Sequence, residues 1–211
     1  MKCEKKDMLV YAITDRHWLH GRTLEEVVAK SIAGGITFLQ LREKNLQGEE
    51  LLQEALAIQK LCRAHGIPFI INDDVEMALK IGADGVHVGQ DDMSVAEARA
   101  KLGPDKILGV SAHNVEEALR AQTDGADYLG SGAVFGTTSK GNVTSLPLET
   151  LRAICEAVSI PVVAIGGVSH DNVAELAGTG IAGVAVISAI YGQENIEEAT
   201  ASLRKLVEEI V

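Results

Sequence analysis

Short apolar runs alternate with longer amphipathic segments along most of the chain. Most of the short runs are rich in Val, Ile and Leu without alternating polar residues, which is typical of parallel strands buried on both faces. We therefore predict strands at Leu9–Thr14, Thr37–Leu41, Phe69–Asn72, Gly85–Val88, Ile107–Ser111, Tyr128–Gly132, Val162–Ile165 and Gly183–Ile187.

The segments between these runs carry helical patterns. Leu24, Val27, Val28 and Ile32, for example, recur at the spacing of one helix face. The same pattern predicts helices at Leu24–Ala33, Leu51–Ala64, Val75–Ile81, Val95–Leu102, Val115–Thr123, Leu148–Val158, Asn172–Ala177 and Ile196–Ile210. Several have a candidate N-cap directly before them, namely Thr23, Asp74, Ser94, Asn114 and Asp171.

Strands that alternate with helices over about 200 residues predict a single (β/α)8 TIM barrel. An open, doubly wound sheet is the structural alternative. Similar Gly-Ala-Asp turns at 82–85 and 125–127, and a related turn at 180–183, favour the barrel because they suggest a repeated βα unit. The dinucleotide fingerprint GxGxxG is also missing from the first helix. We expect one domain over residues 1–211, with residues 1–7 as a short N-terminal extension.

Composition narrows the function classes. A net charge of -11 disfavours nucleic acid and anionic membranes as partners. Three scattered cysteines, without a CxxC pair, predict a reducing cytoplasm and argue against a zinc site or a disulfide framework. No apolar run is long enough to span a bilayer. The oligomeric state stays open, a homo-oligomer included.

Polar side chains gather where the predicted strands end. Gln40, Arg42 and Lys44 lie two residues apart, so a strand would direct all three to one side. Their amide, guanidinium and ammonium groups would bind an anion such as phosphate, or they form a surface ion-pair group. Further polar residues follow the later strands, at Asn72, Asp73, Asp92, Ser111, His113, Thr137, Thr138, Ser139, Lys140 and Ser188.

Asp73 and Asp92 follow adjacent predicted strands. Two carboxylates, completed by phosphate oxygens and water, suit Mg²⁺, which prefers oxygen ligands and dehydrates reluctantly. The alternative is that these residues only cap the next helices. Capping needs one carboxylate per helix, so the paired carboxylates favour a Mg²⁺ site.

Two further segments suit a second anion. Gly166-Gly167 follows a buried strand and, with Ile187 and Ser188, predicts a phosphate cradle of backbone N–H groups. The loop Thr137-Thr138-Ser139-Lys140 carries hydroxyls and a cation. It is a polar surface loop by composition, but its position above the sixth strand favours a lid over a diphosphate. A lone histidine near a strand end is more often structural, so we assign His113 no catalytic role.

Together these motifs resemble the thiamine phosphate synthase family from about Tyr11 to Ile190. The resemblance implies a transferase that joins 4-amino-2-methyl-5-hydroxymethylpyrimidine diphosphate to hydroxyethylthiazole phosphate, with Mg²⁺ held by Asp73 and Asp92. It implies that the pyrimidine diphosphate is held by Gln40, Arg42, Lys44, Asn72, Ser111 and Lys140. It implies that the thiazole phosphate is received by Thr137, Ser139, Gly167, Ile187 and Ser188, with Thr138 as a further substrate-binding residue.

The chemistry implied is a dissociative substitution, in which diphosphate leaves and the thiazole nitrogen attacks the resulting cation. Arg42, Lys44, Lys140 and Ser111 would be its catalytic residues. The loop departs from the family pattern at Gly136, where proline is more frequent, and at Ser139, which replaces a threonine but keeps the hydroxyl. The alternatives are a thiazole tautomerase-like barrel, which does not need the carboxylates, and a non-catalytic sensor of phosphorylated ligands.

Overall fold

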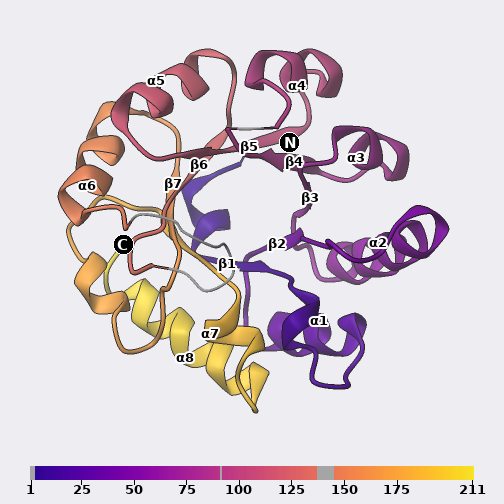
Figure 1. Cartoon of the computed structure of the whole chain (residues 1–211). Coiled ribbons are helices and arrows are strands. Elements are labelled where there is room, and N and C mark those ends of the chain that lie inside the picture. Colours follow the sequence, from indigo (N-terminus) through magenta and orange to yellow (C-terminus); the bar gives the residue numbers. More distant parts are fainter. Residues whose placement is uncertain (1–2, 91, 137–144) are drawn as a thin grey trace.

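The structure is a computed structural model that describes residues 3–90, 92–136 and 145–211. The described strands close into a parallel barrel in chain order, with the helices around it (Figure 1). This confirms the predicted (β/α)8 barrel and excludes the open sheet. The strands are β1 (Val10–Ile13), β2 (Phe38–Leu41), β3 (Phe69–Asn72), β4 (Gly85–Val88), β5 (Ile107–Ala112), β6 (Tyr128–Gly132), β7 (Val162–Ile165) and β8 (Gly183–Val186).

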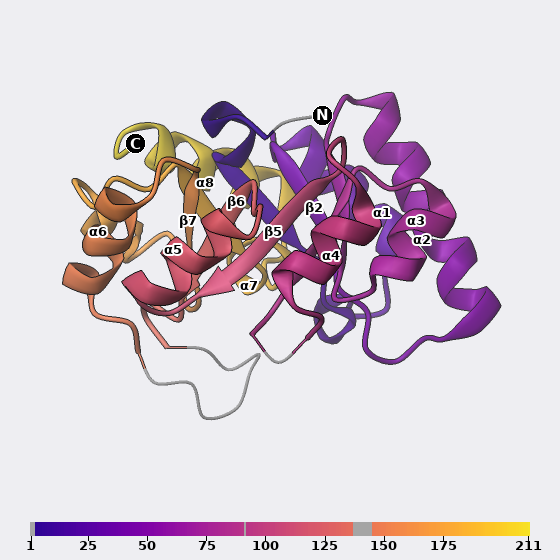
Figure 2. The same cartoon turned by 90° about the horizontal axis from the view of Figure 1, so that it is seen from above.

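The helices pack outside the strands, and the end-on and rotated views agree on this layering (Figures 1 and 2). The α-helices are α1 (Leu24–Ala33), α2 (Gly48–Ala64), α3 (Val75–Ile81), α4 (Val95–Leu102), α5 (Val115–Thr123), α6 (Leu148–Ala157), α7 (Ser188–Tyr191) and α8 (Ile196–Glu208). Short 3-10 helices are η1 (Lys5–Met8), η2 (Arg16–Trp18) and η3 (Val173–Leu176).

Side-chain caps start several helices as expected. Thr23 Oγ1 accepts a hydrogen bond from the Glu26 N–H, and the Glu26 carboxylate accepts one from the Thr23 N–H. This reciprocal pair satisfies two N–H groups that the first turn of α1 leaves without helical partners. The predicted caps Asp74, Ser94 and Asn114 are also confirmed.

The segment between β7 and β8 differs from the prediction. We expected a helix at Asn172–Ala177 capped by Asp171, but the chain forms only η3, and the residue before it is Asn172. The Asn172 side chain accepts from the Ser169 N–H, which makes a tight turn instead of a helix cap. Gly178 and Gly180 then adopt positive φ angles and end the segment after one short turn. Two further differences are that α2 begins at Gly48 and that the short α7 was not predicted.

Two apolar layers hold the barrel together. The larger lies between strands and helices. The smaller fills the barrel interior and consists of Met8, Tyr11, Ile13, Phe38, Ile70, Ile107, Tyr128, Val163, Ala182 and Ala185. Met8 comes from η1, which directly precedes β1, and it is fully buried. The end of the barrel where the strands begin is therefore closed by an apolar side chain.

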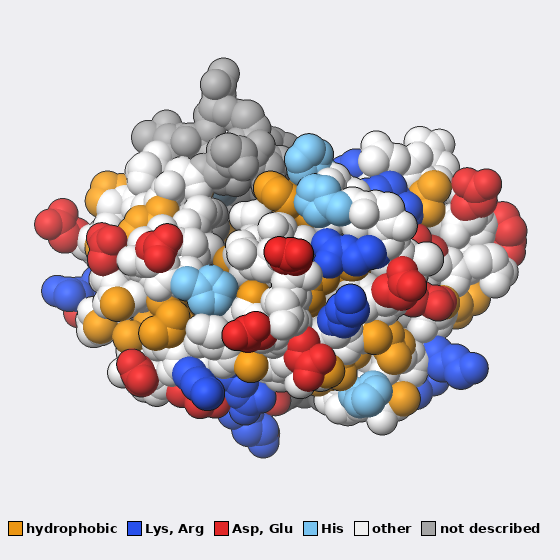
Figure 3. All heavy atoms as spheres, turned by 90° about the horizontal axis from the view of Figure 1, so that it is seen from below, with side chains coloured by type: hydrophobic (Ala, Val, Ile, Leu, Met, Phe, Trp, Pro, Cys, Tyr) orange, Lys and Arg blue, Asp and Glu red, His pale blue; other side chains and the backbone are white. Residues whose placement is uncertain are grey.

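The surface carries both signs of charge. On the face drawn in Figure 3, acidic and basic side chains are interspersed. Within the part of the chain that the structure describes, no helix is long and apolar enough to cross a membrane.

Candidate active site

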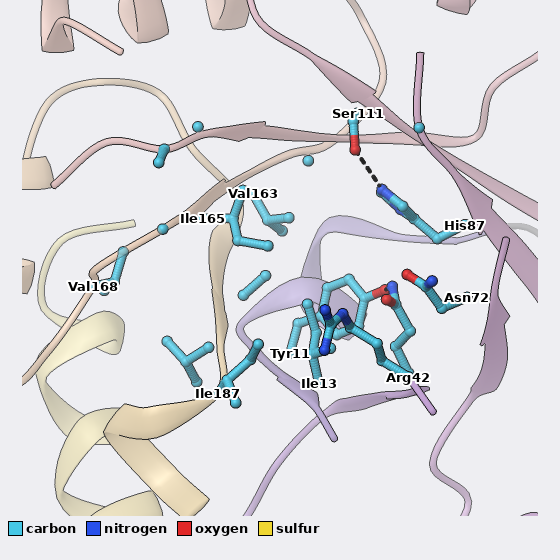
Figure 4. A pocket seen from close by; sticks show the side chains of 18 of the residues that line it. Tyr11, Ile13, Arg42, Asn72, His87, Ser111, Val163, Ile165, Val168 and Ile187 are labelled. Atoms are coloured by element: carbon cyan, nitrogen blue, oxygen red, sulfur yellow. Dashed lines mark hydrogen bonds between the residues drawn. The ribbon is translucent and has the colours of Figure 1, made fainter. Parts of the chain in front are cut away.

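A cavity opens at the carboxyl ends of the strands (Figure 4). Figure 4 shows that Arg42, Asn72, His87 and Ser111 lie on one side of it, whereas Val163, Ile165, Val168 and Ile187 lie on the other. The polar half therefore comes from β2 to β5 and the segments that follow them. The apolar half comes from β7, β8 and the segments that follow them. The cavity is also lined by Gly130, Gly132, Ala133, Gly166 and Gly167.

Strand alternation explains this lining. Parallel pairing sets Gln40 beside Ile70, and Asn72 beside His87. Because successive side chains point to opposite faces, Phe38 and Gln40 of β2 both point inward, one in the barrel core and one at the cavity. The inward layer nearest the carboxyl ends carries the polar groups, as expected for a TIM barrel.

Asp73 and Asp92 are close enough at the rim for their carboxyl groups to interact. Asp73 Oδ2 accepts from Lys44 Nζ at 2.8 Å and from Asn72 Nδ2 at 2.5 Å. Asp92 Oδ2 accepts from the Gly89 N–H at 2.7 Å. Asp73 has a left-handed φ of 64°, a conformation that a short polar side chain tolerates.

The protonation of the two carboxyls is linked. Burial acts to raise the pKa of Asp73, but hydrogen bonding with Lys44 and Asp92 outweighs burial, and the pKa is lowered. Burial raises the pKa of Asp92, and the neighbouring Asp73 raises it further, against the opposing Gly89 hydrogen bond. Adjacent carboxyls that disturb each other in this way are stabilised by a cation between them.

The two carboxylates of Asp73 and Asp92 suit a Mg²⁺ ion that takes its remaining ligands from outside the protein. Among the described residues no group of three or more His, Cys, Asp or Glu side chains is arranged to hold a metal ion. Asp73 and Asp92 supply two carboxylates, and a Mg²⁺ ion bound there would take its other ligands from water and substrate phosphate.

Arg42 is held in place by neighbouring side chains of the protein. Its Nη1 donates to Asp15 Oδ2 at 2.7 Å, and both side chains are largely buried. Thr14 Oγ1 accepts from the Arg42 N–H at 2.9 Å and donates to the Arg42 carbonyl at 3.2 Å. Asp15 also accepts from the His17 N–H, so its own position is fixed. These bonds anchor the guanidinium on the polar side of the cavity.

A chain of side-chain hydrogen bonds runs along the base of the cavity, and all of its members except Tyr128 line the cavity. Gln40 Nε2 donates to the Tyr11 hydroxyl, which lies 2.9 Å from the Tyr128 hydroxyl. The Tyr128 oxygen is 2.9 Å from His87 Nδ1, and His87 Nε2 is 3.0 Å from Ser111 Oγ. Gln40 and Ser111 are candidate site residues, and the chain links them across the barrel.

The turn at Gly166 and Gly167, which lines the cavity, depends on close backbone packing. Gly166 and Gly167 have φ angles of 92° and 69°. A Cβ on Gly167 would lie 2.5 Å from the Gly136 carbonyl oxygen and 2.7 Å from that of Phe135. Only glycine therefore fits there, and both Gly166 and Gly167 line the cavity.

The structure brings most of the predicted residues together. Those that line the cavity are Gln40, Arg42, Asn72, Ser111, Gly167, Ile187 and Ser188. Lys44 and Asp92 join them through Asp73, which also lines the cavity. The predicted loop residues Thr137, Thr138, Ser139 and Lys140 lie outside the described residues. The roles of all these side chains remain predictions.

Sequence reasoning missed three polar groups of the site. Tyr11, Tyr128 and His87 lie within predicted strands and were given no role in the site, but all three belong to the hydrogen-bond chain. The available signal was parity, since His87 and Tyr128 lie two residues before the cavity positions Gly89 and Gly130. His113 lies at the rim, and its Nδ1 is 2.9 Å from Glu117 Oε2.

Comparison with known proteins gives a consistent result. Residues 10–190 match the family described as thiamine monophosphate synthase. Thiamine-phosphate synthase of Clostridium botulinum is 47% identical over 201 residues, covering 95% of this chain and 94% of the relative. The Clostridium tetani protein of the same name is 48% identical over 197 residues, covering 93% and 94%.

A solved structure agrees in both fold and sequence. Thiamine phosphate pyrophosphorylase from Pyrococcus furiosus superposes with a TM-score of 0.89 at 41% identity, and the match covers 98% of each chain.

Proposed function

The chain belongs to the thiamine monophosphate synthase family of transferases, and on this premise we propose the reaction and the roles of its residues. The substrates are 4-amino-2-methyl-5-hydroxymethylpyrimidine diphosphate and hydroxyethylthiazole phosphate, and the products are thiamine phosphate and diphosphate. The observation that carries this proposal is the meeting of Asp73, Asp92 and Lys44 at the mouth of a cavity that also contains Arg42. Such a cluster suits a leaving diphosphate.

The polar half of the cavity would hold the pyrimidine diphosphate. Arg42 and Lys44 supply fixed positive charge beside Asn72, and Lys140 would add a third cation from the loop. Gln40 and Ser111 face the ring. Cations that are positioned in advance stabilise the charge that develops on the departing diphosphate without reorganising during the reaction.

Mg²⁺, when bound, supplies further positive charge to the diphosphate oxygens, and Asp73 and Asp92 would hold it. Lys44 donates to Asp73 and thereby fixes the carboxylate in position. We propose that the protein works in the cytoplasm, as its cysteine content predicts.

The apolar half would receive the thiazole phosphate. Backbone N–H groups near Gly167 and Ser188 suit the phosphate, with the hydroxyls of Thr137, Thr138 and Ser139 as additional donors, and Ile187 lines the same side. The thiazole nitrogen is then directed at the carbon that loses diphosphate. The protein needs no nucleophile of its own, because its contribution is to position both substrates and to stabilise charge.

A single assay tests this reaction against the two alternatives. The enzyme is mixed with both substrates and Mg²⁺, and diphosphate and thiamine phosphate are measured. A transferase releases both in equal amounts. A tautomerase isomerises a thiazole phosphate without releasing diphosphate, and a sensor binds without turnover. Absence of both products would overturn the proposal.

The Mg²⁺ site has its own test. Asp73→Asn should abolish Mg²⁺-dependent turnover, because one of the two proposed carboxylate ligands is lost. Asp105→Asn is the matched control, since Asp105 is an exposed aspartate in the turn before β5, at the other end of the barrel. An unchanged Mg²⁺ titration in Asp73→Asn would remove Asp73 from the metal site.

A further inference from the structure

Five side chains from five strands form one continuous hydrogen-bond chain across the barrel interior. The order is Gln40, Tyr11, Tyr128, His87 and Ser111, and adjacent members are within hydrogen-bond distance. Gln40, Tyr11, His87 and Ser111 line the cavity, whereas the Tyr128 ring lies in the core beneath it. The chain therefore links two candidate ligand-binding groups through the protein rather than through solvent.

The two tyrosines and Gln40 are almost completely buried. Tyr11 is 1% exposed, Tyr128 0% and Gln40 2%. A buried hydroxyl without a partner is costly, so these hydroxyls depend on one another for their hydrogen bonds. Burial raises the pKa of Tyr11 and of Tyr128, and both therefore keep their protons at neutral pH.

The backbone makes room for this arrangement. Gly109 of β5 pairs with Tyr128 of β6, and a Cβ on Gly109 would lie 2.1 Å from the Tyr128 ring. A Cβ on Gly130 would lie 3.2 Å from the His87 ring. Glycine at these positions lets both rings enter the barrel and meet.

The direction of the chain follows from its first bond. The Gln40 amide donates a hydrogen bond to the Tyr11 oxygen. The Tyr11 hydroxyl can then donate to the Tyr128 oxygen, and the Tyr128 hydroxyl can donate to His87 Nδ1. A neutral imidazole that accepts at Nδ1 carries its proton on Nε2. It then donates to Ser111 Oγ, and the Ser111 hydrogen is left for a ligand.

We propose that Tyr128, acting through Tyr11 and His87, is a positioning residue that fixes which hydrogen-bonding groups Gln40 and Ser111 present to the substrate. The proposal rests on the proposed function for the identity of the substrate. In this direction Gln40 keeps its carbonyl oxygen as an acceptor, and Ser111 is a donor. An aminopyrimidine offers the complementary amino donor and ring-nitrogen acceptor, whereas an oxopyrimidine offers the reverse.

Tyr128→Phe tests the proposal because it removes one hydroxyl and keeps the ring. We expect kcat/KM for the aminopyrimidine diphosphate to fall by about 10-fold to 100-fold, as is typical when a group that orients a ligand-binding residue is lost. Discrimination against the corresponding oxopyrimidine diphosphate should fall with it, while the KM for the thiazole phosphate stays unchanged. Tyr11→Phe breaks the chain one bond earlier and should act in the same direction.

Tyr191→Phe is the matched control. Tyr191 is 2% exposed, and its hydroxyl lies 3.1 Å from Ser31 Oγ, outside the barrel interior. Losing this hydroxyl should leave both kinetic constants and the discrimination unchanged. If Tyr128→Phe behaves like Tyr191→Phe, the positioning role is excluded.

A direct measurement separates this proposal from the proposed function. Nitrogen-15 NMR of labelled histidine should show the His87 proton on Nε2 in the wild-type protein and a mixture of tautomers in Tyr128→Phe. A wild-type proton on Nδ1, or an unchanged tautomer in Tyr128→Phe, overturns the chain. Neither result depends on whether the enzyme turns over the two substrates, so failure of the reaction assay alone is distinguishable from failure of the chain.

Discussion

Arg42 is anchored by an acidic partner rather than by the ligand it is expected to meet. Asp15 lies just beyond β1, and its carboxylate fixes the guanidinium at 2.7 Å. A guanidinium fixed in this way loses less conformational freedom when a diphosphate binds. We therefore expect two separable effects, one from the charge of Arg42 and one from its placement.

Arg42→Ala should lower turnover about a hundredfold, which corresponds to roughly 3 kcal/mol for the loss of one positioned donor. Steady-state kinetics with saturating Mg²⁺ measures this. Near-normal turnover would remove Arg42 from the leaving-group role.

Asp15→Asn should lower turnover by about tenfold, because Arg42 keeps its charge but loses its charged anchor. Asp127→Asn is the control, since Asp127 forms a comparable pair with Arg99 at the opposite end of the barrel. We expect it to affect stability without affecting turnover. Equal losses of turnover in both variants would contradict a local role for Asp15.

The residues that line the cavity were predictable from the sequence where the alternation of side chains along a strand decides which way they point. Gln40 and Arg42 both line the cavity, as their two-residue spacing indicated. Tyr11 and Tyr128 could not be assigned from the chain alone, because a buried tyrosine reads as core unless the partner of its hydroxyl is known. Those partners come from other strands and become visible only when the barrel closes.

The turn after β7 shows how an element shapes the site. Gly166 and Gly167 both take positive φ angles, and the carbonyls of Phe135 and Gly136 pack directly against Gly167. Gly178 has a similar φ of 72°, but among the described residues no atom other than those of its chain neighbours lies within 4 Å of its Cβ position. A comparison of Gly178 with Gly167 therefore separates the effect of backbone strain from that of steric crowding.

Gly178→Ala should destabilise the protein by about 1 kcal/mol through left-handed strain alone. Gly167→Ala should cost more and should also raise the KM for the thiazole phosphate, since the turn must move. Urea denaturation and steady-state kinetics measure the two effects. A KM in Gly167→Ala equal to that of Gly178→Ala would argue against phosphate binding at this turn.

Elements were predictable in proportion to the strength of their pattern. The strands were found because buried parallel strands are continuously apolar. The segment after β7 was wrongly predicted as a helix, because its apolar spacing resembles one while an asparagine turn and two glycines limit it to η3. Tertiary position decides such short segments, and propensity alone does not.

At the scale of the whole molecule, the two ends of the barrel have different tasks. The carboxyl ends of the strands carry the cavity, and the opposite end is closed by Met8 of η1, which packs into the interior layer. The resulting separation predicts that stability can change without a change in substrate binding.

Met8→Ala should lower the free energy of unfolding by about 2–5 kcal/mol, because a fully buried side chain leaves a cavity. KM values for both substrates should stay unchanged. Val211→Ala, at a side chain that is 54% exposed, should change stability by less than about 0.5 kcal/mol. A raised KM in Met8→Ala would show that the two ends are coupled.

The space that Gly109 leaves for the Tyr128 ring has a consequence for how this barrel can diversify. Any side chain at 109 collides with the ring, and a smaller residue at 128 leaves an empty volume beside 109. A substitution at either position alone is therefore unfavourable. We expect related barrels to substitute residues 109 and 128 together. Paired substitutions there should mark relatives that recognise the ring of their substrate through different hydrogen bonds.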